Sequence, residues 1–156
     1  MSLDLMLERV KTLLPEDEGL AAWAQQHFGK PIQGFKANKP FQQIHSSELP
    51  ALYVVTGNGQ NALEVGNEMQ RPEVTVPVAF IWHEQDPEKA VQQSAELVDL
   101  MVQALMVRPE LADDEQDPAC EEAHVARFQT DAGNPTGQPR HWIQFEISAI
   151  YEVFQP

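Results

Sequence analysis

The chain has 156 residues, a formal net charge of −14 and one cysteine, Cys120. This charge excludes recognition of DNA or RNA through phosphate groups, which requires clustered lysine and arginine, and a single cysteine excludes a fold stapled by internal disulfides. No apolar run approaches the roughly 20 residues of a membrane-spanning helix, so we expect no membrane segment. The length is that of one domain, 1–156.

Two helices are predicted in the N-terminal segment, residues 1–29. Apolar residues recur at helical spacing over 3–14, and Pro15 is expected to end this first helix. The second helix covers 18–28 and is followed by a glycine, the residue that most often terminates a helix. Residues 30–40 contain two prolines and a glycine, so we expect irregular structure there.

Two strands and a turn begin the body of the domain. Residues 49–56 form a short apolar run typical of a strand, 57–61 have turn chemistry, and 62–71 can continue a hairpin. Large apolar side chains occupy every second position in 74–83, which is the period of a half-buried strand. Pro77 lacks an N–H, so it indicates an edge strand or a bulge.

A long amphipathic helix is predicted over 87–107. Asp86 is a preferred N-cap and Pro87 a preferred first helical residue. Apolar residues then recur every three or four positions and form one stripe. Pro109 ends the helix because proline cannot continue it and disfavours helical geometry at the residue before it.

The C-terminal part combines an acidic loop with two strands. Residues 109–122 are predicted to form the loop, 124–129 a short strand, 131–139 a loop or hairpin connection, and 141–154 a long final strand. One face of the final strand is apolar. The other face is polar apart from three residues, which indicates either partial exposure or a cover formed by a helix or another subunit. These residues are Trp142, Ile150 and Phe154.

These elements predict an α+β fold in which a mostly antiparallel, mixed β-sheet packs against helices. The sheet and the long helix form a body over 40–154. Neither an internal repeat nor a nucleotide-binding glycine pattern is present, because the glycines at 57–59 lack a third glycine and a following helix. We therefore expect no cofactor.

Charge is distributed unevenly along the chain. Residues 1–44 hold equal numbers of acids and bases, whereas seven acids and no base occur in 109–122. Residues 19–47 contain lysines and no acid. The acidic block is either a solvated loop or a surface that meets the basic segment of another copy, since such complementarity steers association. The candidate interface residues are Lys30, Lys36, Lys39, Asp113, Asp114 and Glu115, together with Trp142, Ile150 and Phe154.

The best candidate for a catalytic or metal site is the run from His83 to Asp86. It lacks the second histidine that the H-E-x-x-H zinc motif requires, and helix capping by Asp86 is the simpler explanation. Acidic neighbours of Cys120 are expected to raise the pKa of its thiol, which disfavours a nucleophile. The sequence therefore predicts no catalytic residues and no metal ligands.

The order of elements resembles the tail terminator and minor tail protein group of long-tailed bacteriophages, especially proteins encoded in Mu-like prophages. The resemblance covers roughly 40–154. Its carriers are the strands LPALYVVT and VTVPVAFIWHE, the helix DPEKAVQQSAELVDLMVQAL, the acidic loop, and the final strand HWIQFEISAIYEV. The helical N-terminal third departs from the pattern of the group.

This resemblance implies a non-enzymatic structural protein that assembles as a hexameric ring, either alone or only when it meets the tail tube. The ring would stop growth of the tube and present a surface to head-completion proteins. Its partners would be the tail tube protein and the head–tail joining proteins. It implies a location in the cytoplasm of the bacterial host during assembly and then in the virion tail.

Two other functions stay open. An acidic adaptor or inhibitor would bind a basic protein partner through 109–122 in a salt-sensitive manner. A small hydrolase-type enzyme with a carboxylate or His/Glu site near 83–86 would require a closed pocket and a strongly shifted pKa. The tail terminator is the leading hypothesis, and the adaptor is the main alternative.

Overall fold

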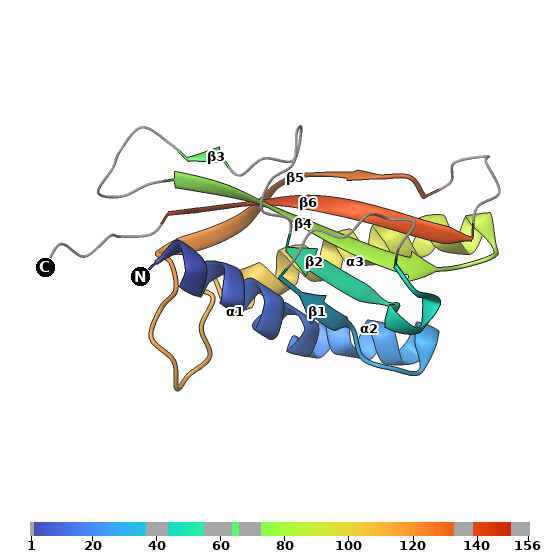
Figure 1. Ribbon diagram of the computed structural model, residues 1–156, viewed down its shortest axis with the longest axis horizontal. Coiled ribbons are helices and arrows are strands. Elements are labelled where there is room, and N and C mark those ends of the chain that lie inside the picture. The colour runs from blue at the N-terminus through green and yellow to red at the C-terminus, as the bar shows by residue number, and fades with distance from the viewer. Residues whose placement is uncertain (1, 37–43, 55–63, 66–72, 133–138, 151–156) are drawn as a thin grey trace, which may run out of the picture.

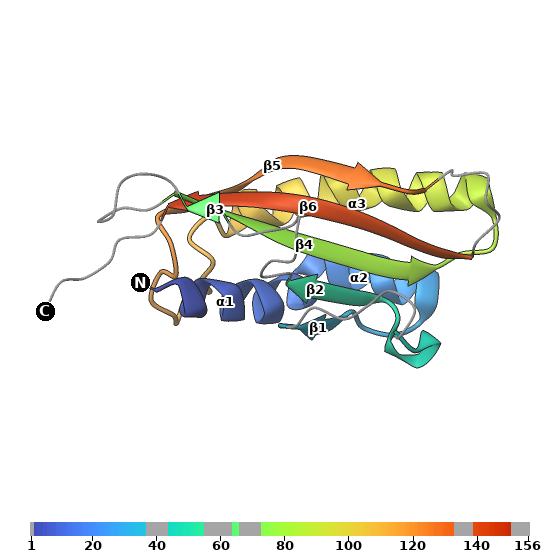
Figure 2. The same cartoon turned by 45° about the horizontal axis from the view of Figure 1, so that its top comes forward.

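The computed structural model describes residues 2–36, 44–54, 64–65, 73–132 and 139–150. Three helices pack on one face of a sheet with strand order β1-β2-β4-β6-β5, and the short β3 also pairs with β4 (Figures 1 and 2). The elements are α1 (Leu3–Glu16), α2 (Glu18–Phe28), β1 (Gln33–Phe35), the 3-10 turn η2 (Ser46–Glu48), β2 (Ala51–Val54), β3 (Glu64–Val65), β4 (Glu73–His83), α3 (Pro87–Val107), β5 (Glu122–Thr130) and β6 (Arg140–Ile150). The β1–β2 pair is parallel and the other pairs are antiparallel, so the predicted α+β fold with a mixed sheet is confirmed.

A single residue, Asp17, joins α1 to α2. Its backbone N–H donates to the carbonyl of Leu14 (3.2 Å), and its carboxylate accepts from the N–H of Leu20 (3.1 Å). Asp17 therefore ends one helix and caps the next. At the far end of α2, Gly29 adopts the left-handed conformation (φ 69°) that terminates helices.

α1 lies very close to β1 at Gly34. The prediction that Pro15 ends the first helix is wrong, because the helix runs on to Glu16. Pro15 has no N–H to donate to the carbonyl of Lys11, four residues earlier. That carbonyl lies against Gly34, where an added Cβ atom would overlap with it. The strand β1 occupies a segment that the sequence predicted to be irregular.

The two longest strands, β4 and β6, pair over eleven residues and form the centre of the sheet. Their alternating apolar face lies under the helices and supplies the main core. The members that β4 and β6 contribute to this core are Val74, Val76, Val78, Phe80, Trp82, Ile143, Phe145, Ile147 and Ala149. The apolar residues predicted at alternate positions of both strands are therefore buried in the described part of the chain.

β4 is a central strand and pairs with β6 without a register shift, so both the edge position and the bulge predicted from Pro77 are wrong. On one side β6 pairs along its whole length. On the other side β3 pairs with residues 74–75 and β2 with residues 78–81. Pro77 falls between these two short partners, so its missing N–H interrupts neither of their ladders.

A smaller apolar cluster lies on the opposite face of the sheet. Ile44 and Leu49 pack there against Tyr53 and Ile81, and Trp142 is partly buried beside them. The hydroxyl of Tyr53 donates to Glu48 at 3.1 Å, and burial, with Glu48 next, raises the pKa of Tyr53 to about 12. A segment of the same chain thus covers Trp142 in part.

β5 is an edge strand and carries a register shift between Val125 and Arg127. The Arg127 guanidinium pairs with Glu146 of β6, with Nη2 2.8 Å from Oε1. No helix in the described part of the chain is long and apolar enough to cross a membrane. The predicted turn at 57–61 and residues 151–154 of the predicted final strand lie outside the described residues.

Candidate functional site

One open cleft of about 600 Å³ lies where α2 ends, β4 ends and α3 begins. Its apolar lining comes from Phe28 and Leu49. The titratable residues that line it come from two stretches of the chain, 27–30 and 83–89. They are His27, Lys30, His83, Glu84 and Lys89.

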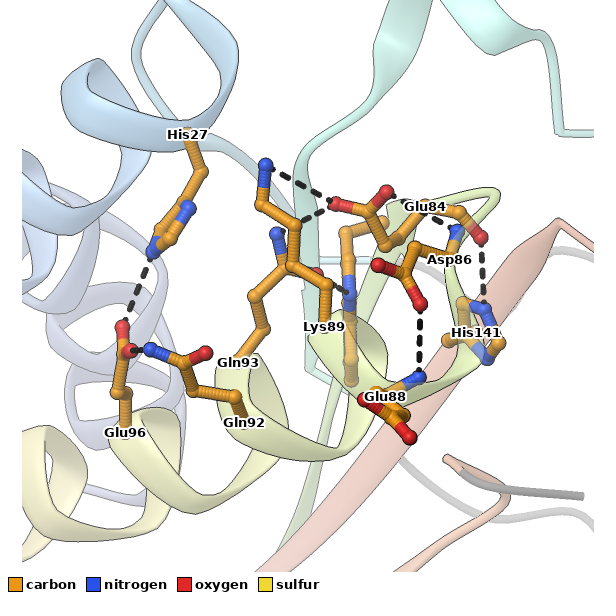
Figure 3. A network of polar contacts seen from close by, with 10 residues as sticks. His27, Glu84, Asp86, Glu88, Lys89, Gln92, Gln93, Glu96 and His141 are labelled. Atoms are coloured by element: carbon orange, nitrogen blue, oxygen red, sulfur yellow. Dashed lines mark hydrogen bonds and ion pairs between the residues drawn. The ribbon is translucent and has the colours of Figure 1, made fainter.

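Glu84 is hydrogen-bonded through both its side chain and its backbone (Figure 3). Its Oε1 accepts from Nε2 of Gln93 (2.9 Å), and its Oε2 accepts from the N–H of Asp86 (3.2 Å). The backbone N–H of Glu84 donates to the carbonyl of Pro139 (2.7 Å), and its own carbonyl lies 3.0 Å from Nε2 of His141. Glu84 therefore ties the end of β4 to α3 and to β6.

A buried relay connects Glu84 to the main core. Gln93 is fully buried, and its Oε1 accepts from the indole Nε1 of Trp82 at 2.9 Å. Its amide nitrogen donates to Glu84. Both ends of the Gln93 amide are thus satisfied, as burial of a polar side chain requires.

The predicted start of the long helix at 86/87 is confirmed. Asp86 is the N-cap of α3, and its Oδ1 accepts from the N–H of Glu88 at 3.1 Å. His83 is exposed at the end of β4. Within the ranges that the structure describes, no group of three or more His, Cys, Asp or Glu residues is placed to hold a metal ion. In the run from His83 to Asp86, Asp86 therefore caps a helix, and Glu84 joins β4 to α3 and β6 by hydrogen bonds.

α2 is linked to α3 beside the cleft. Nε2 of His27 lies 3.0 Å from Oε2 of Glu96, and Gln92 donates to the other carboxylate oxygen at 3.1 Å (Figure 3). The imidazole also contacts the ring of Trp23 edge-on, with centroids 5.5 Å apart. This wall of the cleft is therefore built from interhelical contacts.

Residues 110–117, here called the acidic turn, lie at the opposite end of the molecule, beyond the C-terminus of α3 (Figure 1). Arg9 of α1 holds the turn, because its Nη1 donates to the carbonyls of Leu111 (3.1 Å) and Asp117 (2.9 Å). Leu111 is buried and has a positive φ of 50°. The turn is thus anchored by its backbone, and its acidic side chains are left at the surface.

An apolar groove of about 340 Å³ runs between the C-terminal part of α3 and β5, next to the acidic turn. Val102 and Val125 line it, together with Met106. Met106 and the adjacent Val107 are 75% and 71% exposed. These two side chains form the most exposed apolar surface among the described residues.

The predicted interface lysines lie in different environments. Lys30 lines the cleft. Lys36 forms ion pairs with Asp4 (2.6 Å) and Glu8 (3.3 Å) of α1, and hydrogen bonds to these carboxylates raise the pKa of Lys36. Lys39 lies outside the described residues. Of the two described lysines, Lys30 is therefore the one placed where the structure shows a cleft.

The other predicted interface residues are also dispersed. Asp114 and Glu115 are exposed on the acidic turn. Asp113 is half-buried there, and its carboxylate accepts from the N–H of Glu115 at 3.0 Å. Trp142 belongs to the smaller cluster. Ile150 is half-buried at the end of β6. Phe154 lies outside the described residues.

Cys120 follows the acidic turn and is fully buried. Burial first, and then the charges of Glu110 and Glu121, raise the pKa of its thiol to about 12. The predicted direction of this shift is confirmed, but desolvation is a larger cause than the acidic neighbours. A protonated, buried thiol is a poor nucleophile.

Sequence reasoning missed the residues that complete the basic side of the cleft. Lys89 lies in the first turn of α3, and Arg140 at the start of β6 donates to Ser46, a residue of the cleft lining, at 3.4 Å. Neither residue lies in a recognisable pattern. No family model matches the chain, and no curated protein matches it in sequence.

Proposed function

We propose that this protein is a phage structural protein, a tail terminator that caps the tail tube as a ring and offers the surface for head joining. The resemblance of its strand order and long helix to that group supports the proposal. An assembly protein of this kind acts through its surfaces and not through a reaction centre.

The observation that carries the proposal is the exposed apolar end of α3. Met106 and Val107 are adjacent and strongly exposed, and both belong to a helix whose opposite side is buried in the core. Contiguous exposed apolar residues beside a groove are typical of surfaces that another protein covers. A subunit that closes into a ring on a tube requires such a surface beyond its own core.

Growing tail tubes test this function directly. Purified protein added to polymerising tube protein of the same phage should stop elongation and leave a ring-shaped density at tube ends in negative-stain images. The double substitution Met106→Asp and Val107→Asp should abolish this effect, because two charges replace the apolar surface. Val91→Asp is the matched control, since Val91 is exposed near the other end of α3. Tubes that grow equally long with and without the wild-type protein would refute the proposal.

A second function, an acidic adaptor or inhibitor, has one observation in its favour. The acidic turn is held in place by Arg9 through carbonyl groups, so its exposed carboxylates are presented on a fixed backbone. A basic protein would then bind with an affinity that falls as salt is added. Retention of such a partner from the host or phage, lost when Asp114→Asn and Glu115→Gln are introduced together, would favour the adaptor over the terminator.

A further inference from the structure

The cleft described above concentrates positive charge in a strongly acidic protein. Lys30 and Lys89 line it, and Arg140 reaches Ser46 on its rim. Lys89 is 50% exposed, and its ammonium lies 3.7 Å from the cleft carboxylate, that of Glu84. We call this site the basic cleft.

The cleft carboxylate offsets one positive charge, but Lys30, Lys89 and Arg140 together outnumber it. Both oxygens of Glu84 already accept hydrogen bonds, from Gln93 and from the backbone of Asp86. Each lysine ammonium has three donors, and Lys30 directs one to the carbonyl of Ser47 at 3.4 Å. The lysines of the basic cleft therefore keep donors for a carboxylate from outside.

The acidic turn has the complementary properties. Asp114, Glu115 and Asp117 are exposed, and in the described part of the chain none of them takes part in an ion pair. Arg9 fixes the turn through backbone carbonyls and leaves these carboxylates to solvent. A cluster of like charges on a fixed backbone is favourable mainly when opposite charge approaches it.

The acidic turn and the chain segments that line the basic cleft lie at opposite ends of the long axis of the molecule (Figures 1 and 2). The paired strands β4 and β6 show this separation. Their register joins His83 to Arg140 at the end with the basic cleft and Glu73 to Ile150 at the other end, where the N–H of Glu121 donates to the carbonyl of Ile150. Eleven residues of strand span roughly 35 Å. The acidic turn of one copy therefore cannot enter its own basic cleft.

We propose that the basic cleft of one copy receives the acidic turn of the next copy in a head-to-tail contact. When each copy uses its cleft toward one neighbour and its turn toward another, the contact generates a closed ring or an open filament, whereas a two-fold dimer would use both contacts between the same two copies. This inference defines the subunit contact of the ring proposed above and rests on that function. The partner is a second copy because both complementary surfaces are present on this chain.

Charge reversal at each surface provides the first test. Lys30→Glu with Lys89→Glu removes the positive side, and Asp114→Lys with Glu115→Lys removes the negative side. Each pair should weaken self-association at least about tenfold, because like charges then face each other. Sedimentation velocity and light scattering up to ~1 mM protein cover the range of weak contacts. Wild-type association should also fall between about 0.1 M and about 1 M salt, where the Debye length shrinks from ~10 Å to ~3 Å.

Mixing the two reversed proteins provides the decisive test. In each variant alone the substituted side chains face residues of like charge, whereas in the mixture every contact between unlike copies pairs acid with base. Association should therefore return in the mixture. A carbodiimide, which couples amines to carboxylates in direct contact, should also link Lys30 or Lys89 of one wild-type copy to Asp114 or Glu115 of another.

A control matched to the acidic-turn reversal carries the same change of net charge at other positions. Glu16→Lys with Asp99→Lys reverses two exposed acids on α1 and α3 and should leave association unchanged. Association that survives both reversals, or that fails to return in the mixture, would overturn the contact. A wild-type protein that stays monomeric at every concentration and salt would also overturn it. If that monomer still stops growth of tail tubes, the terminator function stands and only the contact is lost.

Discussion

Gln93 is the residue whose replacement tests most sharply how the end with the basic cleft is held together. Its amide bridges the indole N–H of Trp82 and the carboxylate of Glu84, and its side chain is fully buried. Gln93→Leu keeps a side chain of similar size and removes both hydrogen bonds. The indole N–H is then buried without an acceptor, since Trp82 is also fully buried.

The expected loss follows from the two orphaned groups. A buried donor without a partner costs about 1–3 kcal/mol, and a hydrogen bond to a charged group contributes about 1.5–3 kcal/mol. Glu84 keeps its bond from Asp86 and its contact with Lys89, so its share lies at the lower end. We therefore expect Gln93→Leu to lower the free energy of unfolding by about 3 kcal/mol, which corresponds to a fall in Tm of roughly 6–12 °C in a domain of this size.

Urea and thermal unfolding followed by far-UV circular dichroism measure this loss. Gln92→Leu is the control, because its neighbouring amide bonds Glu96 at an exposed position and its loss should cost less than about 0.5 kcal/mol. In a Trp82→Phe background, Gln93→Leu should cost less than it does alone, since no indole N–H is orphaned. If Gln93→Leu costs no more than Gln92→Leu, the relay contributes nothing and this reasoning is refuted.

Three further predictions concern other parts of the molecule. Gly34→Ala should lower the free energy of unfolding by about 1–3 kcal/mol, because the added Cβ overlaps with the carbonyl of Lys11. Gly29→Ala should lower it by only about 1 kcal/mol, the strain of the left-handed conformation. Chemical denaturation compares the two variants. Arg9→Met should speed hydrogen exchange of the amides in the acidic turn, because the carbonyls of Leu111 and Asp117 lose their shared donor. The same substitution should lower the free energy of unfolding by about 1 kcal/mol. The thiol of Cys120, with its pKa raised from 9.0 to about 12, should resist iodoacetamide at mildly alkaline pH and react only in denaturant. The stabilisation linked to Cys120 is complete below pH 9 and is lost toward pH 12, as the unfolded thiol ionises first, so Cys120→Ala should flatten the alkaline fall in stability.

Different results would contradict each of these expectations. Equal stability of the two glycine variants would show that α1 does not need the close approach at Gly34. Unchanged exchange in the acidic turn, measured against Lys11→Met as a control on the same helix, would show that Arg9 does not hold it. Rapid alkylation of Cys120 in the native protein would show that the thiol is accessible.

Local chemistry made several elements predictable from the sequence. The start of α3 follows from Asp86 and Pro87, which cap and initiate a helix whatever surrounds them. The end of α2 follows from Gly29 in the same way. The alternation of apolar and polar residues in β4 and β6 predicted which side chains are buried, because helices cover one face of each strand along its length.

Features that depend on distant contacts were not predictable. β1 is a three-residue strand whose position depends on the contact of Gly34 with α1, and no periodic pattern in the sequence predicts it. Lys36 was predicted to face another subunit, but its charge is paired with Asp4 and Glu8, about thirty residues away. The basic cleft draws its cations from α3, β6 and the segment after α2, so no run of residues in the chain could reveal it.

The eleven paired residues of β4 and β6 also fix the length of the subunit. They set a separation of roughly 35 Å between the two ends of the subunit. In a regular hexagon the side equals the radius, so six copies joined end to end would form a ring with a radius close to that length. Removing one opposed pair of residues from each end of the two strands would shorten every side by about 7 Å. In the proposed assembly, the length of this strand pair would then determine the diameter of the tube that the ring can fit.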